Sequence, residues 1–445
     1  MVLEQHDHEI NMDNARLLGE SIQMPVSKQI AQTRFLKATM SEYMASWDAK
    51  DLSKRGVPSD RLMRLKRHAS SKQLEAPGNP ILYAPHETPE RIEQFRQTAT
   101  AGKSGGSLMI MQISHPGCQV PTFISPNPLG ASNIKLKDQV MLVDCMDRIY
   151  AKPTPLDKAG ILEIVDQYSY TAKAAYFVGF NWVQLHGAHG YLIAQFLSRT
   201  TNNCTDEYGG TIRDRARIIG DIIQGIQLKV TDPSFVIGIK INSVEFQAKG
   251  FQPEEAAELC KELETIRIDF VKLSGGTCEE LGWNHGESAP RESTKKREAF
   301  FAMFAKDITP QLNRTVSYLT GGFRSASGMA DAIESGISHG IGVARPAGSD
   351  PVIPAEVIDG CISGATYVRL PSEDIITTIL ATGVQMESMA CGIPIIDLSD
   401  PEEVLRFKDA TQRHHKENGE KLLQGIIDPG YFVLGPLDKK IGCGL

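Results

Sequence analysis

The stretch Asn181-Trp-Val-Gln-Leu-His-Gly-Ala-His-Gly-Tyr191 decides the fold prediction, because a short apolar run passes directly into a cluster of polar side chains. Residues 181–187 predict a buried strand of the kind that is covered on both faces. His186 ends this strand, and His189 and Tyr191 follow it in the next loop. In a (β/α)8 barrel the catalytic groups stand at the carboxyl ends of the strands. The stretch therefore predicts an α/β fold with a site at this strand end.

Six further apolar runs predict strands of the same kind: Thr33–Met40, Leu108–Ser114, Phe235–Asn242, Asp269–Gly275, Thr315–Gly322 and Gly340–Arg345. Helical spacing lies between them, in Asp157–Val178, Glu207–Val230, Pro253–Ile266 and Glu298–Leu312. Such alternation predicts parallel strands joined by crossover helices. An open doubly wound sheet normally carries a G-x-G-x-x-G turn after an early strand, and the sequence has none there. A closed TIM barrel is therefore favoured.

The last part of the chain lacks this rhythm. Ile375–Met389 and Glu402–His415 predict helices, and Asp428–Leu445 is rich in Gly and Pro. We expect a barrel domain over residues 1–350 and a C-terminal helical extension over residues 351–445. The extension would pack on the barrel or at a subunit interface of a homo-oligomer.

Composition excludes several classes of protein. The 445 residues carry a net charge of −7, which argues against a nucleic-acid partner. The polar N-terminus resembles no signal peptide, and no run of about 18 apolar residues predicts a membrane span. The 8 cysteines form no C-x-x-C pair, so they suit reduced thiols, and we expect a cytoplasmic location.

The two histidines and the tyrosine have more than one interpretation. Two imidazoles and a phenol at this spacing can converge on one oxygen-bearing substrate, because His donates hydrogen bonds to a carbonyl and Tyr can transfer a proton. A metal-binding pair is disfavoured, since no carboxylate ligand lies nearby in the sequence. The residues alone leave catalysis and a structural role open.

A family resemblance narrows these alternatives. The stretch His186-Gly-Ala-His-Gly-Tyr-Leu-Ile-Ala-Gln-Phe-Leu-Ser198, continuing to Thr205-Asp-Glu-Tyr-Gly-Gly210, resembles the signature of the old yellow enzyme family. These are FMN-dependent NAD(P)H:flavin oxidoreductases and ene-reductases on a (β/α)8 barrel. Further matching pieces lie at Ala38–Glu42, Leu74–Asn79, Gln112–Gly117, Gly238–Asn242, Ser274–Gly276, Leu319–Arg324 and Gly342–Pro346.

The resemblance implies an FMN site made of residues from several strand ends. Gln112 would bind the pyrimidine edge of the flavin, and Lys240 would face its N1 and O2 atoms. A cation there would stabilise the anionic reduced flavin. The remaining implied contacts are Thr39, Met40 and Ser41 beside the ring, and Gly322, Ala344 and Arg345 around the phosphate.

The resemblance also implies a reaction. NADPH or NADH would reduce FMN, which would then reduce an α,β-unsaturated carbonyl or a similar small-molecule acceptor. His186 and His189 would hold the acceptor's oxygen, and Tyr191 would protonate its α-carbon. A lyase or aldolase would instead need a Schiff-base lysine, for which Lys240 and Lys272 are candidates, but the histidine–tyrosine signature does not suit it.

One departure from the family pattern stands out. About twenty residues, including the second strand, are missing between Arg61 and Leu74, so only seven strands are predicted. A barrel closes only when strand number and shear agree, and a gap leaves two open edges. We therefore expect either another segment in the gap or a shortened, catalytically impaired flavin-binding barrel. On this hypothesis FMN binds weakly, because one wall beside the ring is absent.

Overall fold

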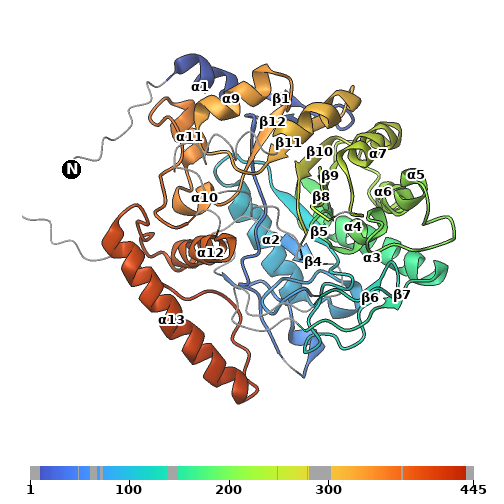
Figure 1. Cartoon of the computed structure of the whole chain (residues 1–445), viewed down its shortest axis with the longest axis horizontal. Coiled ribbons are helices and arrows are strands. Elements are labelled where there is room, and N and C mark those ends of the chain that lie inside the picture. Colours follow the sequence, from blue (N-terminus) through green and yellow to red (C-terminus); the bar gives the residue numbers. More distant parts are fainter. Residues whose placement is uncertain are drawn as a thin grey trace, which may run out of the picture.

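The central sheet of the computed structural model is curled into most of a barrel (Figure 1). The structure describes residues 11–48, 50–60, 68–70, 74–137, 149–247, 249–277, 279, 302–371 and 374–436. Its 8 strands follow the order β3-β12-β11-β10-β9-β8-β5-β4, and all neighbours pair in parallel. The strands are β3 (Phe35–Lys37), β4 (His68–Ser70), β5 (Ile110–Ser114), β8 (Trp182–Gly187), β9 (Val236–Asn242), β10 (Phe270–Ser274), β11 (Val316–Thr320) and β12 (Gly340–Val343). The predicted TIM-barrel class is confirmed.

Crossover helices cover the outside of the sheet (Figure 1). They are α2 (Pro89–Lys103), α3 (Lys158–Phe177), α4 (Leu192–Leu197), α5 (Ile212–Arg215), α6 (Arg217–Lys229), α7 (Pro253–Ile266) and α9 (Ala326–Glu334). The predicted helix over residues 207–230 is therefore two helices that begin later. In the predicted helix Glu298–Leu312, residues 302–308 are helical, a 3-10 turn follows at Thr309–Gln311, and residues 298–301 lie outside the described part. Further 3-10 turns lie at Leu52–Lys54 and Ala84–His86, and a small separate sheet pairs β6 (Leu129–Gly130) with β7 (Thr154–Pro155).

The amino-terminal end of the barrel is closed by the first residues of the chain. Helix α1 (Met12–Gly19) packs beside α9 and α11 (Ile353–Ile358), and the hairpin β1 (Ile22–Gln23) and β2 (Ile30–Ala31) follows it (Figure 1). Met24 of this hairpin packs against Trp182, Phe270 and Tyr318 in one buried cluster. The carboxylate of Asp269 accepts hydrogen bonds from the hairpin, including the Ser27 N–H at 2.9 Å. With this end filled, the opposite end of the barrel is left for a site.

The gap in the barrel is real, but it is partly filled. β4 takes the place beside β5 that the missing strand would occupy, so the prediction of seven strands is short by one. Within the described residues, β3 and β4 form no ladder with each other. Loops join the two edges instead: Ala45 N–H donates to Gly78 O at 2.7 Å, and Ile81 N–H to Gly56 O at 2.9 Å.

A buried arginine holds these loops together. The Arg91 side chain of α2 is fully buried, and its guanidinium donates to four backbone carbonyls. The acceptors are Ser53 O at 2.7 Å, Ile81 O and Arg55 O at 2.9 Å, and Gly56 O at 3.2 Å. Buried carbonyls need such partners, because leaving them unpaired is costly. One side chain thus donates hydrogen bonds to backbone carbonyls that a neighbouring strand would otherwise pair.

The C-terminal extension packs onto the barrel. Short α10 (Pro346–Ser349) leads through α11 to α12 (Ile375–Cys391), which is buried along most of its length, as its apolar sequence suggests. The long helix α13 (Pro401–Leu423) runs along the outside (Figure 1). Both predicted helices are confirmed, and α13 continues eight residues beyond its predicted end. None of the described helices combines the length and apolar character needed to cross a membrane.

Candidate active site

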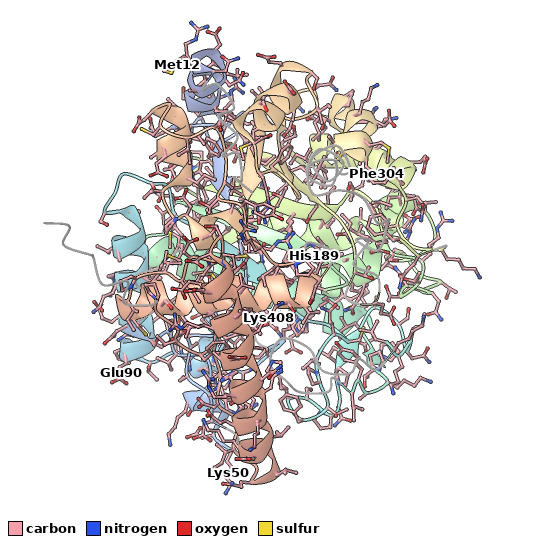
Figure 2. The ribbon with its side chains drawn as sticks, turned by 60° about the vertical axis from the view of Figure 1, so that its left-hand side comes forward. Met12, Lys50, Glu90, His189, Phe304 and Lys408 are labelled. Atoms are coloured by element: carbon pink, nitrogen blue, oxygen red, sulfur yellow. The ribbon has the colours of Figure 1, made fainter. Side chains whose placement is uncertain are left out.

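A cavity of about 390 Å³ lies at the carboxyl ends of the strands. This is within the usual size range of small-molecule sites, about 300–1,000 Å³. Figure 2 labels His189, one of its lining residues, near the middle of the view. Most of the predicted site residues line the cavity: Thr39, Met40, Ser41, His189, Tyr191, Lys240, Gly322, Ala344 and Arg345. The structure therefore brings together residues that are spread over about three hundred positions of sequence.

His189 and Tyr191 face the cavity from the loop after β8. His189 has a left-handed backbone with φ +58, and its N–H donates to the Asn242 amide oxygen at 3.2 Å. Its Nε2 lies 2.9 Å from Ser274 Oγ. With its amide nitrogen toward the loop, Gln119 donates to the carbonyls of His189 and Gly190 at 3.0 and 3.3 Å. These bonds fix the loop, so the imidazole has a defined position.

The charge on this imidazole is set by its surroundings. Burial, together with the positive charges of Lys240 and Lys272, holds the pKa of His189 well below its usual value. The ring is therefore neutral at physiological pH. A neutral imidazole still carries one N–H, so it can donate a hydrogen bond to a substrate oxygen.

Lys240 is a buried lysine on β9. Its side chain is 4 % exposed, and no carboxylate in the described part of the chain forms an ion pair with it. Burial lowers its pKa to about 7. In the sheet it stands between His186 and Lys272, its register partners on the neighbouring strands. A buried lysine without an anion is unfavourable, so this position fits a ligand that carries negative charge.

The ends of β11 and β12 form a cradle of backbone. Gly321 and Gly322 line the cavity with φ values of +135 and +85, a backbone conformation that favours glycine. At Gly342 a Cβ atom would collide with Thr320 Oγ1, so only glycine fits. Thr320 Oγ1 is buried and has no hydrogen-bond partner in the described residues. Together with Arg345 at the next strand end, these groups fit a phosphate.

Two predicted residues lie behind the cavity surface. His186 is buried on β8, its Nδ1 accepts the Ala188 N–H at 3.3 Å, and its ring centroid is 4.5 Å from that of Tyr191. Gln112 is 3 % exposed on β5, opposite Gln184 of β8. Neither is among the described residues that line the cavity.

Much of the apolar lining of the cavity was not predicted from the sequence. Tyr43 and Tyr150 come from barrel loops, and Met386 and Tyr431 come from the C-terminal extension. The extension also contributes Ile375, Ile376 and Ile379 of α12. Arg324 also lines the cavity and was not predicted, although it lies in the Leu319–Arg324 segment that matches the family pattern. The extension has no such segment, so its lining residues could not be found in the same way.

The donor set fits FMN better than a metal ion. A flavin mononucleotide needs a cation beside its pyrimidine edge and donors around its phosphate, and Lys240, Arg345 and the Gly321–Gly322 turn supply both. No group of three or more His, Cys, Asp and Glu side chains in the described residues could hold a metal.

Comparisons with known proteins give the family of this chain. The sequence model of the NADH:flavin oxidoreductase / NADH oxidase family matches residues 70–361. NADH-dependent flavin oxidoreductase nadA of Aspergillus parasiticus is 38 % identical over 404 residues, which cover 87 % of this chain and 88 % of nadA. Two solved structures share the fold: morphinone reductase (TM-score 0.62, 19 % identity, 80 % of this chain and 92 % of that one) and the old yellow enzyme from Trypanosoma cruzi (TM-score 0.64, 16 % identity, 79 % and 94 %). The chain belongs to the NADH:flavin oxidoreductase / NADH oxidase family, which is the old yellow enzyme family.

Proposed function

We propose that this protein binds FMN in the cavity and uses NADH to reduce an activated alkene, such as an α,β-unsaturated carbonyl. The observation that carries the proposal is the convergence of His189, Tyr191 and Lys240 on one cavity that also contains a phosphate cradle. The choice of NADH over NADPH rests on the similarity to the NADH-dependent flavin oxidoreductase nadA.

Lys240 and the cradle would hold the cofactor. Lys240 would lie against the pyrimidine edge, while Gly322, Ala344 and Arg345 would bind the phosphate. Thr39, Met40 and Ser41 would line the ring, and Gln112 would support the same edge from β5. When bound, FMN would supply the hydride-transfer chemistry that links NADH to the acceptor.

His189 and Tyr191 would act on the acceptor. The neutral His189 would donate a hydrogen bond to the acceptor's carbonyl oxygen and so draw electron density away from the alkene. In the overall reaction NADH is oxidised, a hydride reaches the β-carbon of the acceptor, and Tyr191 gives a proton to its α-carbon. Tyr191 is then reprotonated from solvent. His186 would hold the Tyr191 ring in place, since the two rings are in edge contact.

The test separates binding, reduction and proton transfer. The visible spectrum of the purified protein should show bound flavin, and anaerobic addition of NADH should bleach it. A Tyr191→Phe variant should lose alkene reduction by about 100-fold, the range for general acid catalysis, while its flavin is still bleached at close to the wild-type rate. Equal losses in both half-reactions would contradict the proton-donor role.

A second candidate is a flavin-binding barrel with impaired catalysis. It is favoured by β3 and β4, which form no ladder with each other in the described residues. On this reading FMN is lost during purification, and NADH bleaches little of what remains. A protein that keeps one FMN per chain, and whose flavin is fully bleached by NADH, would rule it out.

A further inference from the structure

Thr378 of the C-terminal helix α12 contacts Arg345, a residue that lines the cavity. We propose that Thr378 is a positioning residue for FMN binding, which holds the Arg345 guanidinium in the orientation that receives the phosphate. This inference rests on the proposed function and extends it to a helix that follows residues 70–361, the part that matches the family model.

The contact between the two side chains is well defined. Arg345 Nη1 donates a hydrogen bond to Thr378 Oγ1 at 2.7 Å. The hydroxyl of Thr378 in turn donates to Ile375 O at 3.0 Å. Because its own hydrogen is engaged there, Thr378 Oγ1 presents lone pairs to the guanidinium, which can only donate.

The surroundings of Thr378 explain why a hydroxyl matters at this position. Thr378 is 8 % exposed, and Ile375, Ile376 and Ile379 beside it line the cavity. This stretch of α12 is therefore mainly apolar, with one buried hydroxyl directed at Arg345. A buried polar group is retained at low cost only where it finds a partner.

The helix itself is held firmly against the loop that carries Arg345. Gly348 of α10 packs so closely on α12 that a Cβ atom there would collide with Thr382 Cγ2. Thr382 Oγ1 donates to Thr378 O at 2.8 Å, one turn away. Thr378 is thus anchored, and it can act as a fixed support for a flexible side chain.

Fixing Arg345 affects ligand binding because of the length of its side chain. A free arginine loses rotamer entropy when it binds an anion, and a preset guanidinium loses less. A hydrogen bond to a charged group is strong enough that its loss should weaken FMN binding by about 10-fold.

The experiment measures flavin affinity rather than turnover. Flavin-free protein is titrated with FMN and, separately, with riboflavin, which has no phosphate, and the dissociation constants are read from flavin fluorescence. Thr378→Val keeps the shape of the side chain and removes the hydroxyl, while Thr378→Ser keeps the hydroxyl. Thr377→Val makes the same chemical change one residue away, at a position that does not line the cavity. Thermal unfolding of each flavin-free variant reports its stability.

We expect Thr378→Val to raise the dissociation constant for FMN about 10-fold and to leave that for riboflavin within about 2-fold. Thr378→Ser and Thr377→Val should bind FMN like the wild type. The inference is overturned if Thr378→Val binds FMN normally, if it weakens riboflavin equally, or if Thr378→Ser fails to restore binding. A wild type that binds neither flavin would instead overturn the proposed function itself.

Discussion

The two sides of the barrel are built differently. From β8 to β11 the strands pair in parallel over four to six residues at each interface. On the other side β3 and β4 have three residues each and form no ladder with each other in the described part of the chain. There the chain depends on loop hydrogen bonds, on Arg91, and on the C-terminal extension packed over the cavity.

The difference shows how a shortened barrel can keep a site. The regular side carries His189, Tyr191 and Lys240, the three side chains that the proposed reaction uses. The irregular side supplies a wall, partly from the first strand end and partly from Tyr431 and Met386. The cavity therefore has a wall even on the side where the described strands form no continuous ladder, because residues of the C-terminal extension line it there.

The largest loss of stability on the irregular side is expected from replacing Arg91. Arg91→Met should lower the free energy of unfolding by about 3 kcal/mol or more, because buried carbonyls lose their donors. Chemical denaturation of the flavin-free protein measures this. The control is Arg96→Ala on the same helix, whose ion pair with Glu93 at 2.6 Å is exposed. Its effect should be below about 1 kcal/mol. Equal effects of the two variants would show that Arg91 does not hold this side together.

The same difference between the two sides explains which elements could be predicted from the sequence. Each strand from β8 to β12 lies within a predicted run, because a strand buried on both faces is a continuous apolar segment. β4 was missed, since three residues carry no periodicity and only their neighbour β5 makes them a strand. The α12 helix was predicted from its apolar sequence, but not its place at the site. Contacts such as that of Tyr431 Oη with Ser41 O join residues 390 positions apart, which no local pattern encodes.

A smaller effect, on the regular side, is expected from the titration of Lys240. Burial lowers its pKa from 10.5 to about 7, so in the flavin-free protein the positive charge is present below pH 7 and is lost above it. An anionic ligand binds the charged form. FMN affinity should therefore fall about 10-fold or more between about pH 7 and 9, a range in which the phosphate, with a second pKa of about 6, is already fully ionised.

Lys240 also makes the stability of the flavin-free protein depend on pH, but this stability rises with pH where the FMN affinity falls. Between about pH 7 and 10.5 the unfolded chain binds more protons at this residue than the folded chain, so the flavin-free protein becomes more stable as pH rises. Lys240→Met removes both effects: it should bind FMN more weakly at pH 7 and show a flatter dependence of affinity and unfolding on pH. A wild-type affinity that stays constant up to pH 9 would contradict a role for the Lys240 charge in binding.

The smallest effect is expected at Tyr431, which forms part of the cavity wall on the irregular side. The half-buried Tyr431 ring lies 5.5 Å from that of Tyr43 and packs on Gly383 of α12, where a Cβ atom would collide with it. Tyr431→Leu shortens this wall and should raise KM for a bulky aryl enone about 5-fold, the equivalent of about 1 kcal/mol of lost apolar contact, with kcat little changed. Val433→Ala is the matched control, since Val433 is exposed in the same segment. If Tyr431→Leu instead loses FMN, the extension supports the cofactor rather than the acceptor, and the irregular side contributes more to binding than a wall.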